Sequence, residues 1–134
     1  MSDMQTTIKL VEDFHNTFKI GNASKQTLID EKDYILRFNL INEENEEYLE
    51  ACKNNDLSEI ADALGDQLYI LCGTILKHGL QYKIDEVFKE IHQTHIIGGA
   101  RGGVGRAWAK WRVFGHFARA IAVNLRRRNM NILF

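Results

Sequence analysis

The sequence predicts an all-α protein, namely a four-helix bundle followed by an atypical basic C-terminal segment. The 134-residue chain contains no proline, and because proline ends helices, its absence suits long helices with short connections. Apolar residues recur at intervals of three and four, which is the period of an amphipathic helix. A hydrophobic content of 45% with 26% charged residues is typical of a soluble globular domain.

The first two expected helices cover residues 3–20 and 27–53. Ser2 or Asp3 is available as the N-cap of the first helix, and residues 21–24 form the break after it. The apolar face of the first helix consists of Met4, Ile8, Val11, Phe14 and Phe18. The inward positions expected in the second helix are Leu28, Ile35, Phe38, Ile41, Tyr48, Leu49 and Cys52.

The third expected helix follows a short polar turn at residues 54–56. Asp56 can cap it while Glu59 closes a capping box, and Gly79 is the expected stop. Its apolar positions are Ile60, Leu64, Leu68, Leu71 and Ile75. A fourth helix is expected over residues 84–93, with Val87, Phe88 and Ile91 buried.

The distribution of charge divides the chain in two. All 18 acidic residues but only nine of the 17 basic residues lie at or before Glu90, so the net charge of that part is −9. The remainder carries eight basic residues and no acid, and therefore a net charge of +8. We predict a helical domain over residues 1–94 and a Gly-, Arg- and aromatic-rich segment of uncertain structure over residues 95–134.

Cysteine usage and hydropathy indicate a cytoplasmic protein. Cys52 and Cys72 form no CxxC pair and have no histidine at ligand spacing, so we expect small core residues in a reducing compartment. No secretory signal is visible after Met1, and no apolar run approaches the roughly 20 residues that a membrane helix needs. The five histidines are dispersed, and we expect surface or capping roles for them.

Two pairs of carboxylates carry the chemistry that the sequence predicts. Glu44 and Glu47 share a helix face because they are three residues apart, and so do Glu59 and Asp62. The turn at residues 54–56 would fold the two helices antiparallel and bring the pairs together. Four converging carboxylates require a cation, and oxygen ligands without His or Cys select Mg²⁺, Mn²⁺ or Ca²⁺ rather than zinc.

The alternative for these acids is a solvated helix face, which is the usual role of an acidic run. Asp62 and Asp66 argue against it because they lie among apolar residues in a helix that becomes strongly apolar. Burial of a carboxylate costs several kcal/mol unless it is paired or bound to a metal. The two pairs together therefore favour a metal site.

The order ExxE, a short spacer and ExxD resembles the signature of the all-α nucleoside triphosphate pyrophosphohydrolases. That superfamily includes the MazG-like proteins, the dimeric dUTPases and phosphoribosyl-ATP pyrophosphatase. Residues 37–51 and 59–69 carry the motif, and residues 70–74 (Ile-Leu-Cys-Gly-Thr) also resemble phosphoribosyl-ATP pyrophosphohydrolase-like members. The resemblance covers about residues 11–93 and implies a four-helix bundle of the MazG-like type.

The resemblance implies hydrolysis of a nucleotide between its α and β phosphates, which yields a monophosphate and pyrophosphate. It assigns one or more Mg²⁺ ions, with Mn²⁺ as a substitute, to Glu44, Glu47, Glu59 and Asp62. Glu43 or Asp66 would orient the attacking water or act as general base, unless their roles are structural. Arg37 would contact phosphate oxygens, unless it forms only a surface ion pair. A homodimer or homotetramer is implied, and no protein partner is identifiable.

Three interpretations of the segment after residue 95 stay open. Trp108, Trp111, Phe114 and Phe117 interleave with arginines, as in a surface that binds nucleic acid or an anionic membrane. Alternatively, the segment packs as an extra helix on the acidic body. The slightly favoured interpretation is a frameshift, a fusion or an appended end. The alternative to an enzyme is thus a catalytically silent helical module whose basic aromatic tail contacts nucleic acid or membrane.

Overall fold

The computed structural model describes residues 3–100, with side chains up to residue 96, and within that range it contains helices and no strands. The helices are α1 (Met4–Thr17), α2 (Glu31–Lys53), α3 (Leu57–Lys77) and α4 (Ile84–Ala100). The predicted all-α class and its four helices are therefore confirmed. The chain divides after Tyr82 into two compact units, of which the first holds α1–α3 and the second begins with α4.

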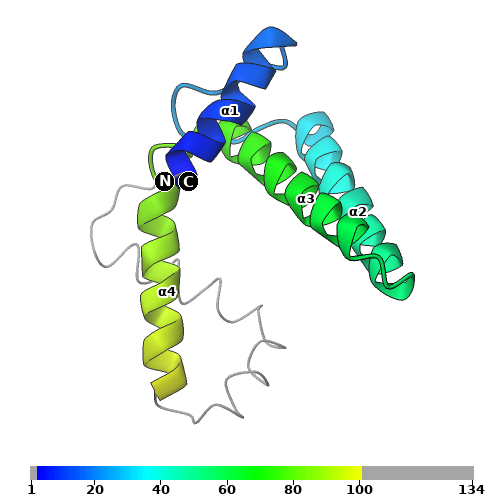
Figure 1. Ribbon diagram of the computed structural model, residues 1–134. Coiled ribbons are helices and arrows are strands. Elements are labelled where there is room, and N and C mark those ends of the chain that lie inside the picture. Colours follow the sequence, from blue (N-terminus) through cyan, green and yellow to red (C-terminus); the bar gives the residue numbers. More distant parts are fainter. Residues whose placement is uncertain (1–2, 101–134) are drawn as a thin grey trace. The chain divides into compact units, whose positions relative to one another are not determined.

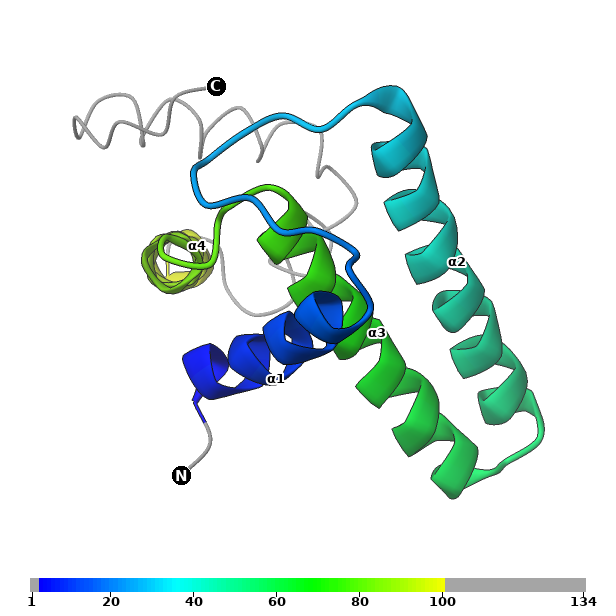
Figure 2. The ribbon, with the colours of Figure 1, turned by 90° about the horizontal axis from the view of Figure 1, so that it is seen from above.

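Within the first unit, α2 and α3 lie side by side and run antiparallel, and α1 crosses the C-terminal half of α3 (Figures 1 and 2). The core of this unit is small, because few large side chains are fully enclosed. Its buried apolar residues are Ile8 and Val11 of α1, Ala51 of α2, and Ala63, Cys72, Ile75 and Leu76 of α3. Most of the core therefore lies where α1 meets α3, and α2 contributes one small residue.

Helix α1 begins where the sequence predicts and ends earlier. The Asp3 carboxylate caps it by accepting hydrogen bonds from the Thr6 N–H at 2.8 Å and the Thr6 hydroxyl at 3.0 Å. The helix stops at Thr17 because Lys19 adopts a left-handed φ of 57° and the Ile20 N–H donates to the His15 carbonyl at 2.9 Å. The expectation of a helix up to residue 20 was wrong by this final turn.

Helix α2 begins four residues later than predicted. Asp30 caps it by accepting from the Asp33 N–H at 2.9 Å, and the Thr27 N–H donates to the His78 carbonyl instead of entering a helix. Leu28, expected to point inward, is 77% exposed. Other expected inward positions of α2 and α3 are also exposed, namely Ile35, Phe38, Tyr48, Leu49, Leu64, Leu68 and Leu71.

The turn between α2 and α3 spans residues 54–56, as predicted. Asn55 adopts a left-handed φ of 53°, and the Asn55 and Asp56 N–H groups close the end of α2 on the carbonyls of Cys52 and Ala51. Asp56 caps α3 by accepting from Ser58 and Glu59 N–H groups. Only half of the expected capping box forms, because the Asp56 N–H is already bonded to Ala51. The carboxylate of Glu59 is thus not needed for the cap.

The C-terminal end of α3 is closed by a Schellman motif. The Gly79 N–H donates to the Leu76 carbonyl at 3.2 Å and the Leu80 N–H to the Ile75 carbonyl at 3.0 Å. Gly79 has a φ of 65°, and a Cβ atom there would collide with the backbone carbonyl of Lys25. Glycine is required here both by the backbone angle and by the close approach of the loop at Lys25.

Helix α4 runs past the point where the composition changes. It continues through Gly98 and Gly99 to Ala100, although a helix end was expected at residue 93 and a break from Gly98. A glycine weakens a helix by about 1 kcal/mol relative to alanine but does not interrupt its hydrogen bonds. The predicted domain boundary between residues 94 and 95 falls inside α4 and stays a prediction. The predictions for Trp108, Trp111 and the remaining tail lie outside the described residues.

None of the four described helices combines the length and apolar character that a membrane crossing requires.

Candidate metal centre between α2 and α3

Three of the four predicted metal ligands lie where the end of α2 faces the start of α3. Glu47 of α2 and Glu59 and Asp62 of α3 line one open hollow of about 200 Å³. Glu50, Ala51 and Asn54 complete its lining. The three-residue turn between the helices produces this arrangement, because it places the last turns of α2 beside the first turns of α3.

Glu44 is the half-buried member of the acidic group. Its Oε2 atom is enclosed and has no hydrogen-bond partner. The pKa of the Glu44 carboxyl is raised, first by burial and then by the negative charges of four acids, in order Glu47, Asp66, Glu43 and Asp62. The structure therefore places Glu44 among carboxylates of both helices, including the two residues predicted as catalytic.

The other acids of the group, Glu43, Glu47, Glu59, Asp62 and Asp66, are exposed in this chain. The sequence argument that Asp62 and Asp66 are buried was therefore wrong, because the α3 face that carries them is open to solvent. In the part of the chain that the structure describes, no three His, Cys, Asp or Glu side chains are already arranged to hold a metal ion. The acids are thus neighbours rather than a preformed cage.

The donor set nevertheless fits a hard divalent cation. An enclosed carboxylate oxygen without a donor is a costly feature, and mutual repulsion raises that cost further. A cation bound among Glu44 and its neighbours would remove both penalties. Mg²⁺ suits such a site, since it is commonly held by a few carboxylates and keeps several waters.

Gln67 bridges the two helices beside this group and was not singled out from the sequence. Its Nε2 atom donates to the Glu44 carbonyl and to Asn45 Oδ1, both at 3.4 Å. No sequence signal identifies this bridge, because it depends on how α2 and α3 pack against each other. The bridge helps to fix the backbone of α2 at Glu44.

Arg37, the predicted phosphate ligand, lies half-buried between α2 and α3. Its Nε atom donates to Thr74 Oγ1 at 2.9 Å and its Nη2 atom to the Ile70 carbonyl at 2.6 Å. Burial lowers the pKa of the guanidinium, and the charge of Asp33 opposes that shift. Two of the donors of Arg37 are thus used to hold α3, and phosphate binding by the others stays a prediction.

His15 is a buried residue that sequence reasoning placed at the surface. It is 3% exposed, and its Nδ1 atom lies 2.6 Å from Asn22 Oδ1. The space for its ring comes from Gly73, where a Cβ atom would lie 3.0 Å from His15 Nε2 and 2.6 Å from Arg37 Nη2. The missing side chain of Gly73 therefore lets a histidine of α1 and an arginine of α2 meet over α3. His78, by contrast, has the expected capping position at the end of α3.

The stability of the protein is expected to fall in mild acid because of His15. Burial lowers the pKa of this imidazole, the Asn22 hydrogen bond opposes the shift, and the cations Arg37 and Lys77 reinforce it. The folded pKa is thus below the unfolded pKa of about 6.5, so the unfolded state binds the proton first. The contribution of neutral His15 is present above pH 6.5 and is lost as the pH falls through the folded pKa.

Urea unfolding of the wild type and of His15→Gln at pH 7.5 and 5.5 measures this effect. The wild type should lose more unfolding free energy between the two values than the variant does. His92→Gln is the control, because it removes an exposed imidazole. An equal loss in the wild type and His15→Gln would contradict the assignment.

Arg37→Lys is expected to lower the unfolding free energy by about 2 kcal/mol, because hydrogen bonds from a charged donor contribute about that much. An ammonium group lacks the planar fork that reaches both Thr74 Oγ1 and the Ile70 carbonyl. Thr74→Val, which removes one acceptor, should have a smaller effect in the same urea titration. Unchanged stability together with a raised KM would instead assign Arg37 to the substrate.

The fold and the acidic site define a class of protein. Consecutive antiparallel helices with the spacings ExxE and ExxD place the chain in the MazG-like superfamily of all-α nucleoside triphosphate pyrophosphohydrolases. The model of the phosphoribosyl-ATP pyrophosphohydrolase family matches residues 11–95, and the chain belongs to that family. Comparison with curated proteins and with solved structures gives no match. Membership in the family supports a pyrophosphohydrolase activity in general.

Proposed function

We propose that the protein is a Mg²⁺-dependent nucleotide pyrophosphohydrolase. It cleaves a nucleoside triphosphate-like substrate between the α and β phosphates and releases a monophosphate and pyrophosphate. The observation that supports the proposal most directly is the enclosed, unpartnered Oε2 atom of Glu44 amid the charges of Glu47, Asp62 and Asp66. A site with this much uncompensated negative charge has the chemistry to bind a cation, and through it a polyphosphate.

Glu44, Glu47, Glu59 and Asp62 would hold the metal, and Mn²⁺ would substitute for Mg²⁺. When bound, the ion neutralises phosphate charge and makes the attacking water more acidic. Three of these residues line the open hollow between α2 and α3, which leaves space on the solvent side for a polyphosphate. Glu44 does not line that hollow, but its enclosed Oε2 atom lies near the charges of Glu47 and Asp62, and it would complete the ligand set.

Glu43 and Asp66 are the proposed residues for accepting a proton from the attacking water. Both are exposed, and both act electrostatically on Glu44. Asp66 is four residues after Asp62, so it lies one turn further along the same face of α3. Arg37 lies seven residues before Glu44, about 10 Å along the axis of α2. A guanidinium there would contact the end of the substrate that extends away from the metal.

The experiment that tests this function is pyrophosphate release from a panel of nucleoside triphosphates and phosphoribosyl-ATP, with Mg²⁺ and with EDTA. We expect release that depends on the metal and that is stopped by EDTA. Analysis of the products by ³¹P NMR distinguishes cleavage between the α and β phosphates from loss of the terminal phosphate. No release from the folded, metal-bound protein would contradict the proposal.

The alternative function, a silent helical module whose tail binds nucleic acid or membrane, depends on residues outside the described range. No observation on α1–α4 favours it. The cytoplasmic location expected from the sequence likewise stays a prediction.

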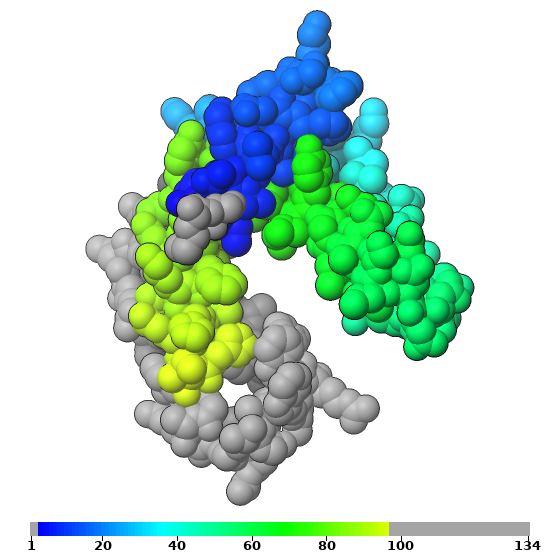
Figure 3. Space-filling view, in the orientation of Figure 1, coloured from blue at the N-terminus to red at the C-terminus, as the bar shows by residue number. Residues whose placement is uncertain are grey.

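A homodimer or homotetramer is part of the proposal, because α2 and α3 leave a large apolar surface uncovered. Ala51 is the only buried residue of the 23 in α2. Tyr34, Phe38, Ile41 and Leu71 line an open hollow of about 230 Å³ between the two helices. Figure 3 shows α3 at the surface over much of its length. Exposed apolar surface of this extent is typical of a protein interface.

Phe38→Glu is expected to convert the oligomer to a monomer, since it puts a charge at the centre of that surface, where Phe38 is 65% exposed. Light scattering after size-exclusion chromatography measures the mass. Leu10→Glu on α1, where the leucine is 64% exposed, is the matched control and should leave the mass unchanged. A wild-type protein that is monomeric at micromolar concentration would contradict this part of the proposal.

A further inference from the structure

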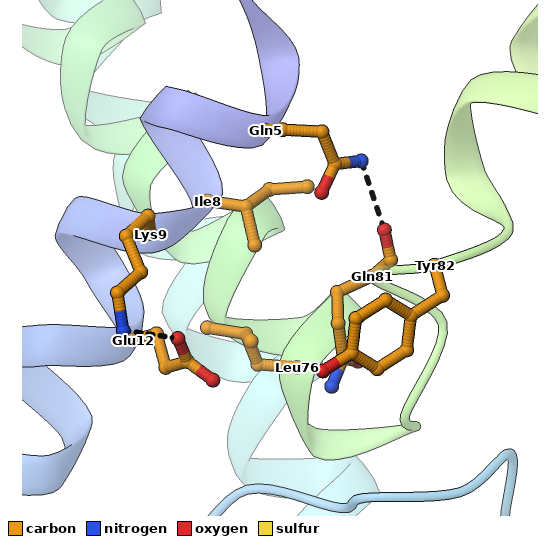
Figure 4. A pocket seen from close by; sticks show the side chains of 7 residues that line it. All are labelled: Gln5, Ile8, Lys9, Glu12, Leu76, Gln81 and Tyr82. Atoms are coloured by element: carbon orange, nitrogen blue, oxygen red, sulfur yellow. Dashed lines mark hydrogen bonds and ion pairs between the residues drawn. The ribbon is translucent and has the colours of Figure 1, made fainter.

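A second hollow lies between α1 and the segment that follows α3, with a volume of about 240 Å³ (Figure 4). Its lining consists of Gln5, Ile8, Lys9 and Glu12 from α1, Leu76 from α3, and Gln81 and Tyr82. The four residues of α1 are spaced by one, three and four positions and therefore share one face. Leu76 lies fourteen residues after Asp62, about 21 Å along α3, so this hollow is separate from the acidic centre.

Gln81 provides a buried acceptor that has no donor. The residue is 6% exposed, and its Oε1 atom is enclosed without a hydrogen-bond partner. The orientation of the amide is fixed, because Nε2 donates to the Ala23 carbonyl at 3.1 Å and a flipped amide would set two oxygens against each other. The backbone is also held, since Gln5 Nε2 donates to the Gln81 carbonyl at 2.9 Å. The unmet group is thus an acceptor, and it requires an N–H or O–H.

Two aliphatic side chains and one aromatic ring of the lining offer contacts to a ligand. Ile8 is 3% exposed and Leu76 is completely buried, so they form an apolar floor. Tyr82 is 74% exposed, so little packing holds its ring. The ring can therefore turn to admit a ligand to Gln81 and then stack on it. The lining thus joins a small apolar floor and one aromatic ring to polar side chains.

The charges at this hollow do not favour a phosphate. Lys9 is the only basic residue of the lining, and its ammonium is paired with Glu12 at 2.8 Å and with Asp13 at 3.2 Å. A polyphosphate would meet no unpaired cation there. An uncharged ligand meets no such penalty. The volume is also smaller than the roughly 300–1,000 Å³ of sites for drug-sized molecules, which limits the ligand to about one ring.

We propose that this hollow is a binding site for a small, flat, uncharged molecule that carries an amide-type N–H, of the lactam or cyclic imide class. The N–H donates to Gln81 Oε1, one face of the ring contacts Ile8 and Leu76, and the other face stacks on Tyr82. The site is independent of the proposed hydrolysis.

The test uses the full chain with ¹³C-labelled Ile and Leu methyl groups and two matched probes, 2-pyridone and N-methyl-2-pyridone. We expect 2-pyridone to shift the methyl signals of Ile8 and Leu76 in a saturable titration. The N-methyl probe, which lacks the donor, should bind at least about tenfold more weakly, as expected for the loss of one hydrogen bond. Absence of shifts with either probe, or equal affinity of both, would overturn the proposal.

Two variants assign the contacts. Tyr82→Ala should weaken 2-pyridone binding severalfold, whereas Tyr48→Ala, which changes an exposed tyrosine of α2 that lines neither hollow, should leave it unchanged. Gln81→Met keeps the length of the side chain and should make the affinities of the two probes equal. Gln81→Met also removes the hydrogen bond from Gln81 Nε2 to the Ala23 carbonyl. If this variant fails to fold, the comparison of the two probes and the Tyr82→Ala variant still test the proposal. Unchanged binding by Tyr82→Ala would contradict the proposed stacking.

Discussion

Glu59→Gln is expected to reduce nucleotide hydrolysis at least about a hundredfold, because it removes a proposed metal ligand. Loss of a group that only orients such ligands already costs about 10–100-fold. The fold should survive this change. Asp56 caps α3 without help from the Glu59 side chain, since its own N–H is bonded to the Ala51 carbonyl. The measurement is pyrophosphate release at saturating Mg²⁺, with circular dichroism to confirm the helical content.

Asp62→Asn should give the same result, and both variants should bind Mn²⁺ more weakly in an electron paramagnetic resonance titration. Glu46→Gln is the matched control. Glu46 is an exposed acid of α2 whose Oε1 accepts from Asn42 at 3.1 Å, and it does not line the acidic hollow. Hydrolysis that is unchanged in Glu59→Gln and Asp62→Asn, or reduced equally in Glu46→Gln, would contradict the assignment of the metal ligands.

Gly79→Ala is expected to lower the unfolding free energy by about 3 kcal/mol, the largest stability effect we predict. About 1–2 kcal/mol comes from placing a side chain on a left-handed residue. The remainder comes from the collision of the new Cβ with the Lys25 carbonyl, which is backbone and cannot turn aside. The loop at residues 23–27 would have to leave the end of α3, where it is held by two backbone hydrogen bonds, Ala23 to Leu76 and Thr27 to His78.

Gly21→Ala separates the two contributions. Gly21 has a similar φ of 82°, but no atom lies within 4 Å of its missing Cβ. Its substitution should therefore lower the stability by only about 1–2 kcal/mol. Urea titrations followed by circular dichroism measure both variants at one pH. If the two substitutions have equal effects, the close approach of Lys25 makes no contribution to stability.

The helices could be predicted because their signals are local. The period of the apolar residues, the caps at Asp3 and Asp56 and the glycine at position 79 all act within a few residues of the helix they define. The helix boundaries were predicted wrongly where the backbone conformation depends on a residue far away in the sequence. Residues 27–29 leave the helical pattern because Thr27 bonds to His78, which lies 51 positions away.

For the candidate site, the sequence likewise predicted only the features that depend on local spacing. The spacing of Glu44 with Glu47 and of Glu59 with Asp62 placed each pair on one helix face, and the short turn brought the pairs together. The sequence could not reveal that Glu44 is the enclosed member or that Gln67 bridges to its backbone. Burial and cross-helix contacts depend on how two helix surfaces meet, and periodicity carries no information on that.

The sequence by itself thus determined the all-α class and the four helices. It also identified the acidic residues on the facing parts of the second and third helices. Only the tertiary structure decided the positions of Arg37 and His15. Both depend on Gly73, whose missing side chain opens a gap in α3 that an arginine from α2 and a histidine from α1 enter together. Such a gap exists only once three helices have packed. A glycine within a helical sequence cannot by itself indicate which side chains will fill the space beside it.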